Sequence, residues 1–164
     1  MFWKKRIVNG DTRIIEMREG TAEIFIEADP QKVWDCLSDI KNYHRWVTWF
    51  KAKVPLHIDR LEKVGDYFDY ETTILGVKFT GRLVSVERIP PQRSAFCLVS
   101  QNRGGGEYLL EPMVGGTRVH YTIWGDIPSS YLGKIVERVV LANNVLKNMN
   151  DHLRNLKVYA EQEH

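Results

Sequence analysis

The stretch IFIEADPQKVWDCLSDIKNYHRW, residues 24–46, decides the fold of this chain of 164 residues. It starts with a strand in which apolar and polar side chains alternate. Asp29 can then cap a helix that begins at Pro30, because its carboxylate can accept hydrogen bonds from the free amides of the first turn. We expect this helix to span residues 30–38, to bury one apolar face and to be followed by a second helical turn. The side chains expected inside are Val33, Trp34 and Leu37, with Tyr43 and Trp46 in the second turn.

The remainder of the chain predicts an antiparallel meander followed by one long helix. Glycine and proline signals separate apolar runs with strand character. Apolar residues at three- and four-residue spacing from Leu132 to Leu156 predict an amphipathic helix over residues 131–161, ~45 Å long. Gly104-Gly105-Gly106 is expected to form a flexible connection, and Gly115-Gly116 a hairpin turn. After the strand over residues 21–28, the predicted strands cover residues 48–58, 67–75, 77–89, 93–100, 107–114 and 117–127.

Three segments carry a resemblance to a known family. They are Ala28-Asp29-Pro30 to Trp34, the Tyr43-x-x-Trp46 pair, and GRLVSVERIPP at residues 81–91. Together they resemble the polyketide cyclase/dehydrase and lipid-transport group of the START-like (SRPBCC) superfamily, over about residues 21–160. The resemblance implies an α+β helix-grip fold. In that fold a curved antiparallel sheet of about seven strands surrounds a long C-terminal helix, two short helices follow the first strand, and a hydrophobic cavity lies between sheet and long helix.

The resemblance also implies a division of the chain. Residues 1–20 are expected to be an N-terminal extension, and residues 21–164 a START-like ligand-binding domain. The chain is 43% hydrophobic and 27% charged, with a formal net charge of +2, as is typical of a soluble globular protein. This balance gives no reason to expect nucleic acid as a partner.

Other classes of protein are disfavoured by what the sequence does not contain. No run approaches the roughly 18 apolar residues of a membrane span, so we expect no integral membrane association. The MFWKKR start has no apolar run behind it and does not predict a secretion signal. Cys36 and Cys97 are expected to be reduced thiols of a cytoplasmic protein. Neither the cysteines nor the five histidines show metal-ligand spacing, so no metal and no cofactor is predicted.

The candidate ligand site follows from the implied cavity, which one face of the strands and the helix stripe should line. Tyr121 lies on the more apolar face of its strand, so we expect that face to point inward. Asn143 and Asn150 border the helix stripe and could orient a polar group of a ligand, or they are half-exposed amides. The predicted ligand-binding residues are Trp46, Phe68, Tyr70, Phe79, Tyr108, Tyr121, Asn143, Leu146, Met149 and Asn150.

No catalytic residue can be predicted. The chain has no G-x-S-x-G motif and no P-loop. Arg82 and Glu71 could pair across the predicted hairpin. If they face inward they could polarise a carbonyl, and if outward they are a surface ion pair.

Three hypotheses of function follow. The leading one is non-catalytic binding of a hydrophobic small molecule, whether lipid, quinone-like or polyketide-like, in an internal cavity. The first alternative is a polyketide cyclase/dehydrase-type enzyme, which needs a titratable group in the cavity. The second is a regulatory protein–protein interaction module, with a homodimer as one form. Exposed aromatic residues would then mark the interface, the candidates being Phe2, Trp3, Trp49 and Phe50.

Overall fold

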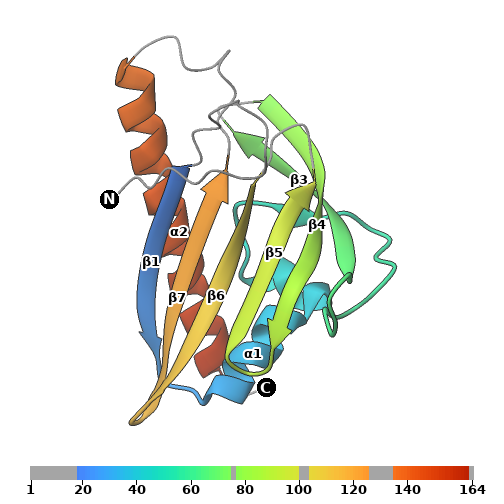
Figure 1. Cartoon of the computed structure of the whole chain (residues 1–164), viewed down its shortest axis with the longest axis vertical. Coiled ribbons are helices and arrows are strands. Elements are labelled where there is room, and N and C mark those ends of the chain that lie inside the picture. The colour runs from blue at the N-terminus through green and yellow to red at the C-terminus, as the bar shows by residue number, and fades with distance from the viewer. Residues whose placement is uncertain (1–17, 75–76, 100–103, 126–134, 163–164) are drawn as a thin grey trace, which may run out of the picture.

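The structure, a computed structural model, describes residues 18–74, 77–99, 104–125 and 135–162. The strands form one antiparallel sheet in the order β1-β7-β6-β5-β4-β3-β2. Figure 1 shows α2 lying across one face of this curved sheet, with α1 at one end, which is the helix-grip fold predicted from the sequence. The elements are β1 (Arg18–Ile26), α1 (Pro30–Ser38), η1 (Ile40–Arg45), β2 (Lys51–Ala52), β3 (Tyr67–Ile74), β4 (Val77–Ile89), β5 (Arg93–Val99), β6 (Gly104–Met113), β7 (Gly116–Gly125) and α2 (Ile135–Glu161).

The opening segment forms as its residue pattern predicts. The Asp29 carboxylate accepts a hydrogen bond from the Lys32 amide at 3.0 Å, and Pro30 begins α1. This cap satisfies one of the free amides of the first turn. Strand β1 begins at Arg18, three residues earlier than expected. Residues 1–17 of the predicted N-terminal extension lie outside the described residues.

The predicted strand over residues 48–58 is wrong. Only Lys51–Ala52 pair as β2, at the edge of the sheet beside β3. The Lys53 amide still donates to the Asp69 carbonyl at 2.8 Å, after which the chain leaves the sheet. Pro55 follows, and proline has no amide hydrogen to continue a ladder. A short, weakly paired segment therefore precedes β3.

The glycine-rich segments also differ from expectation. Gly104, Gly105 and Gly106 are not a connection but the first residues of β6. A Cβ at Gly106 would lie 2.7 Å from Cζ of Phe96, so the missing side chain makes room for that ring. At the β6–β7 hairpin the turn residues are Val114 and Gly115, with φ of +82° at the glycine. Gly116 instead begins β7, so the expected turn was one residue too late.

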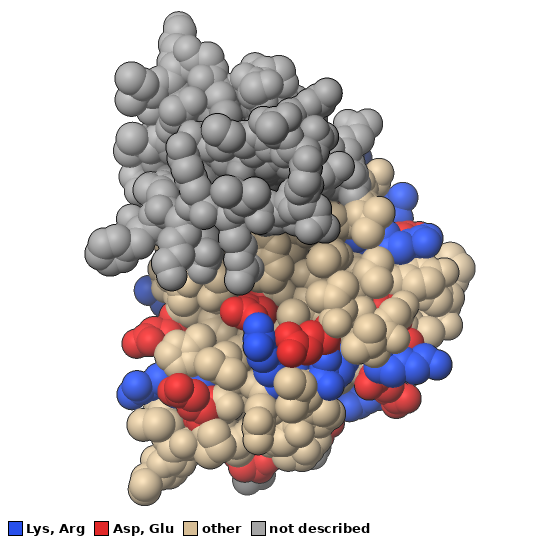
Figure 2. Space-filling view, viewed as in Figure 1, with Lys and Arg blue, Asp and Glu red and all other residues tan. Residues whose placement is uncertain are grey.

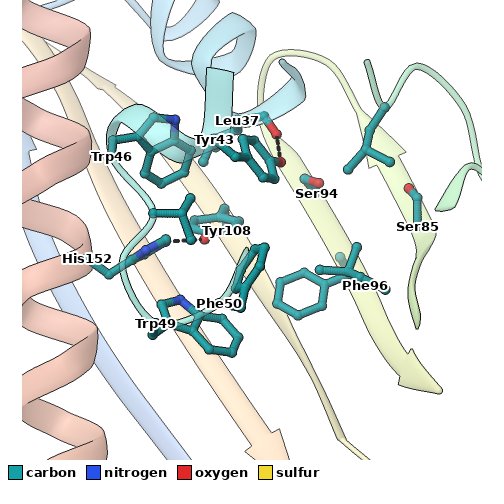
Figure 3. A pocket seen from close by; sticks show the side chains of 14 residues that line it. Leu37, Tyr43, Trp46, Trp49, Phe50, Ser85, Ser94, Phe96, Tyr108 and His152 are labelled. Atoms are coloured by element: carbon teal, nitrogen blue, oxygen red, sulfur yellow. Dashed lines mark hydrogen bonds between the residues drawn. The ribbon is translucent and has the colours of Figure 1, made fainter. Parts of the chain in front are cut away.

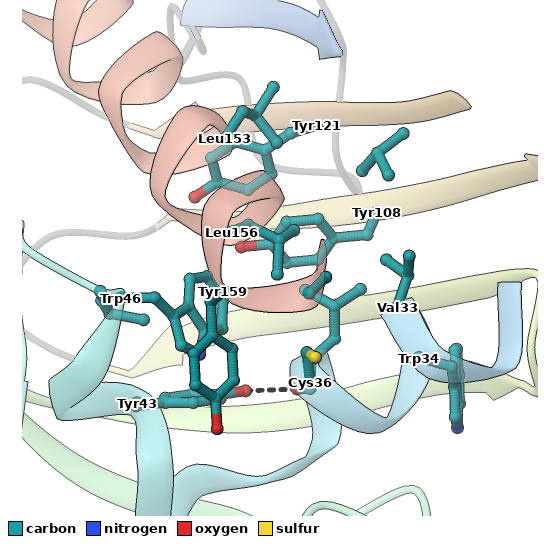
Figure 4. Close-up of a cluster of buried hydrophobic side chains, with 14 of the residues drawn as sticks. Val33, Trp34, Cys36, Tyr43, Trp46, Tyr108, Tyr121, Leu153, Leu156 and Tyr159 are labelled. Carbon is teal, nitrogen blue, oxygen red and sulfur yellow. Dashed lines mark hydrogen bonds between the residues drawn. The ribbon is translucent and has the colours of Figure 1, made fainter. Parts of the chain in front are cut away.

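The core lies between the sheet and the C-terminal half of α2 (Figure 4). Helix α2 buries Met149, Leu153 and Leu156, which confirms this part of the predicted stripe. Leu132 and the side chains of residues 135–145 lie outside the described residues. Each fully buried side chain of this size contributes roughly 1.5–3 kcal/mol by leaving water. The face of β7 that carries Val119 and Tyr121 points inward, as the sequence indicated.

The opposite face of the sheet carries charges of both signs (Figure 2). Arg82 pairs with Asp69, its cross-strand neighbour, with 2.8 Å between Nε and Oδ1. The expected partner Glu71 lies opposite Thr80 instead. Because the Arg82–Asp69 pair is exposed to solvent, it contributes little to stability. It does not face the space between sheet and helix, so Arg82 takes no part in a ligand site there.

Candidate functional site

A small cavity lies where α1, η1 and the segment after η1 meet β4, β5, β6 and α2 (Figure 3). Its volume is about 20 Å³, enough for one water molecule. The space between the sheet and α2 is therefore nearly filled by side chains at this place. Thirteen of the fourteen lining residues are buried, and Trp49 is only partly so. The lining residues are Leu37, Tyr43, Trp46, Val47, Trp49, Phe50, Leu61, Leu83, Ser85, Ser94, Ala95, Phe96, Tyr108 and His152.

One polar pair joins the two halves of the fold across this cavity. The hydroxyl of Tyr108, on β6, lies 2.7 Å from Nε2 of His152, on α2. His152 is 1% exposed and is surrounded by aromatic rings. Its ring centroid lies 4.9 Å from that of Trp46, 5.1 Å from Tyr121 and 6.3 Å from Trp49. Tyr121 in turn stacks on Tyr108 at 4.5 Å, with 9° between the rings.

This environment sets the charge state of the pair. Burial without a charged partner lowers the pKa of His152 to about 3. Burial likewise raises the pKa of the Tyr108 hydroxyl well above its usual range. At neutral pH the imidazole and the phenol are therefore both uncharged. A proton-transfer group works best with a pKa near the working pH, so this pair is better suited to hydrogen bonding than to acid–base chemistry.

Several polar atoms at the cavity have no partner. Within the described part of the chain, these include Nε1 of Trp46, Oγ of Ser85 and Nδ1 of His152, all buried. A buried donor or acceptor without a hydrogen bond costs about 1–3 kcal/mol. One water molecule in the cavity could satisfy only some of these atoms. The site thus keeps hydrogen-bonding capacity that its own fold does not use.

Arg88, on β4, holds one wall of the cavity together. Its Nη1 donates to Ser94 Oγ at 2.9 Å, and its Nη2 donates to the Leu61 carbonyl at 2.7 Å. The same Nη2 donates to Ser38 Oγ in α1. The guanidinium carbon lies 4.1 Å from the centre of the Trp34 ring, within range of a cation–π contact. One side chain therefore ties α1, the loop before β3 and β5 to β4.

The sequence model of the polyketide cyclase / dehydrase and lipid transport family matches residues 17–161. The chain belongs to this family. No curated protein matches it in sequence. In the described ranges, no helix has the length and apolar character that a membrane crossing requires.

Solved structures similar to this family member support the same fold. A di-domain ARO/CYC, BexL, from the BE-7585A biosynthetic pathway is 15% identical, with a TM-score of 0.70 over 90% of this chain and 51% of that one. The Zhui aromatase/cyclase from Streptomyces sp. R1128 is 18% identical, with a TM-score of 0.67 over 88% of this chain and 94% of that one. Protein CV1439 from Chromobacterium violaceum is 17% identical, with a TM-score of 0.66 over 88% of this chain and 98% of that one.

The structure brings two of the predicted ligand-binding residues to the cavity and packs a third against them. Trp46 and Tyr108 line the cavity, and Tyr121 stacks on Tyr108. The cavity lining does not include four others, which lie in or against the core: Phe68, Tyr70 and Met149 are buried, and Leu146 is half-buried. The side chains of Phe79 and Asn143 lie outside the described residues.

Two expectations about polar and aromatic residues need correction. Asn150 is exposed, and its amide donates to the Leu146 carbonyl of its own helix at 2.9 Å, so the structure does not bring it to the cavity. Trp49 and Phe50 were expected to be exposed interface residues. Phe50 is 6% exposed, and both side chains line the cavity because the chain turns inward between η1 and β2. Phe2 and Trp3 lie outside the described residues.

Sequence reasoning missed His152, Ser85 and Ser94. A signal for His152 was present, because it follows Met149 by three residues and precedes Leu153 by one, within the apolar stripe of α2. A histidine in such a stripe is expected to be buried. The two serines gave no signal, since serine is common on either face of a strand.

Proposed function

We propose that the protein binds a hydrophobic small molecule between the sheet and α2, at the Tyr108–His152 cavity. The observation that carries this proposal is an aromatic-lined cavity at which three buried polar atoms of the described residues, Trp46 Nε1, Ser85 Oγ and His152 Nδ1, lack partners. Pockets for small molecules have this character, mostly apolar walls with a few placed polar groups. Membership in the polyketide cyclase / dehydrase and lipid transport family supports the same assignment.

Binding requires the cavity to open. A volume of about 20 Å³ holds a water molecule but no ring compound, so a ligand must displace lining side chains. Trp49 is the best candidate for this movement, because it is the lining residue that is not fully buried. The two-residue strand β2 begins two residues later, at Lys51. We therefore place the ligand's entrance at Trp49.

An enzymatic role of the cyclase/dehydrase type receives less support from the same geometry. Such a role needs a group that exchanges protons near neutral pH. Burial moves the pKa values of His152 and Tyr108 away from neutrality in opposite directions. Among the described lining residues, only His152 has a side chain whose ordinary pKa in water lies near neutrality. Binding without catalysis is the function that these contacts favour.

A blocking variant and a matched control test the proposal. Ser85→Leu adds more bulk than the free volume and so blocks the cavity, whereas Ser85→Ala removes the hydroxyl and leaves the space. We expect protein purified under mild conditions to carry a lipophilic compound, detectable by native mass spectrometry, in the wild type and in Ser85→Ala. The folded Ser85→Leu protein should lack it. The proposal fails if hydrophobic compounds neither co-purify with the wild type nor raise its melting temperature when added, since a ligand of the folded state must stabilise it.

A further inference from the structure

Trp49 closes the cavity beside His152. It is the partly buried residue of the lining, and its ring centroid lies 6.3 Å from that of His152, with 72° between the rings. It also packs edge-on against Phe50, with 4.6 Å between the ring centroids. The Trp49 carbonyl accepts a hydrogen bond from the Thr72 hydroxyl, and the two-residue pairing with β3 begins only at Lys51. A segment with so little strand pairing opens at a lower free-energy cost than the central strands do.

In the closed cavity, His152 lacks a group that can balance a positive charge. Its Nε2 lies 2.7 Å from the Tyr108 hydroxyl, and its Nδ1 has no partner among the described residues. Tyr108 and Tyr121 face it from β6 and β7, and both stay uncharged because burial raises the pKa of their hydroxyls. None of the fourteen lining residues in the described ranges is Lys, Arg, Asp or Glu. On its own helix, Asp151 and Arg154 pair with each other at the surface.

The charge state of His152 therefore differs between a closed and an open cavity. Burial with no nearby charge lowers its pKa to about 3 in the closed structure. When Trp49 moves aside and water reaches the ring, the pKa returns towards its ordinary value of 6.5. The closed form is favoured while the imidazole is neutral. This advantage is complete above pH 6.5 and is lost progressively as the pH falls below it.

We propose that acid opens the cavity: protonation of His152 favours a state in which Trp49 has moved away from α2, so that ligand exchange is slow at neutral pH and fast at mildly acidic pH. This inference rests on the proposed function and adds the regulation of the same site. Relative to pH 7.5, the ratio of open to closed molecules should rise about 4-fold at pH 6 and about 30-fold at pH 5, as expected for one titrating group.

Amide hydrogen exchange measures this opening without any ligand. Exchange of residues 47–53, followed by mass spectrometry and corrected for the pH dependence of the intrinsic rates, should accelerate by these factors in the wild type. The amides of Val47 and Lys53 mark the two ends of this segment, and each donates to a backbone carbonyl at 2.8 Å. Strand β7 should stay better protected than the segment at every pH, since a local opening costs less than global unfolding.

Two histidine variants provide the test and its control. His152→Gln removes the titrating group and keeps a side chain that can accept a hydrogen bond from Tyr108, so the acceleration at low pH should disappear. His152→Phe, which keeps an aromatic ring, gives the same test if the glutamine variant does not fold. His120→Gln is the matched control, because His120 lies on the opposite face of the sheet, between Glu23 and Glu111. It should keep the full acceleration.

The outcomes separate this inference from the proposed function. An exchange rate of residues 47–53 that does not depend on pH, or an acceleration retained without His152, overturns acid-driven opening. Equal protection of this segment and β7 does so too, because the opening is then global unfolding. Stopped-flow association of the neutral dye Nile red tests binding itself. Dye that binds while exchange is independent of pH refutes the opening alone, whereas pH-dependent exchange without dye binding at either pH supports the opening and counts against the proposed function.

Discussion

The buried histidine makes a quantitative prediction about stability and pH. His152 is uncharged in the folded protein, where its pKa is about 3, and it titrates near its ordinary value of 6.5 when the chain unfolds. Below pH 6.5 the unfolded chain therefore binds one more proton than the folded chain. Stability must fall as pH decreases from 6.5 towards 3, and this contribution is constant above 6.5. The slope from this one group is about 1.4 kcal/mol per pH unit.

The perturbation that isolates the effect is His152→Phe, which keeps a ring in the aromatic surroundings and removes the titrating group. Near pH 7 the variant should be less stable than the wild type by about 1–3 kcal/mol, because the Tyr108 hydroxyl loses its partner. On going to about pH 5 the wild type should lose about 2 kcal/mol through His152, a loss that the variant does not share. The difference between the two proteins should thus shrink by about 2 kcal/mol.

Urea unfolding followed by tryptophan fluorescence measures these free energies, with the m-value checked at each pH. Leu153→Ala serves as control, since it removes a fully buried side chain next to His152 in sequence without removing a titratable group. It should cost about 2–5 kcal/mol equally at both pH values. A gap between wild type and His152→Phe that stays constant from pH 7 to pH 5 would refute the assignment of His152 as a buried neutral group.

Three further results are expected. Arg88→Lys should lower the free energy of unfolding by about 2–4 kcal/mol, because an ammonium cannot keep both the hydrogen bonds and the stacking on Trp34. A loss below about 1 kcal/mol, measured by urea unfolding, would contradict this role of Arg88. Gly106→Ala should cost about 1–3 kcal/mol, since the added methyl group overlaps the Phe96 ring, and a neutral effect on the melting temperature would be inconsistent with that contact. Trp49→Ala should cost about 2 kcal/mol and raise the association rate of a hydrophobic ligand in stopped-flow measurements, whereas an unchanged rate would place the entrance elsewhere.

The sequence predicted those parts of the fold that local rules determine. The cap at Asp29, the buried face of α1 and the part of the α2 stripe from Met149 to Leu156 follow from the spacing of neighbouring residues, and the described residues show all three. The prediction of a strand over residues 48–58 failed because most of this segment is a loop whose aromatic side chains pack inward. That packing depends on tertiary contacts and not on local sequence. The role of Gly106 could not be foreseen either, since it depends on Phe96 in the adjacent strand.

The site was harder to predict than the fold because backbone irregularity decides which side chains reach it. The register between β4 and β5 shifts between Ser85 and Glu87. Such a bulge changes which residues of the strand point inward. Leu83 and Ser85, two residues apart on β4, both face the cavity. After the bulge, Arg88 is half-buried and lies behind the cavity wall, where it donates to Ser94. A strict two-residue period places Arg88 on the opposite face, with the solvent-exposed charges.

The position of the Tyr108–His152 pair links the architecture to the proposed binding role. Two phenylalanines would fill nearly the same volume between β6 and α2 without burying polar atoms, and would avoid the penalty of about 1–3 kcal/mol for each group left without a partner. The fold instead keeps an imidazole, an indole N–H and two serine hydroxyls around a cavity large enough for one water molecule. Groups that break the packing rules in this way are typical of functional sites. A polar ligand that hydrogen-bonds to these groups relieves part of the energetic penalty, so affinity for such a ligand and instability of the empty site have the same physical origin.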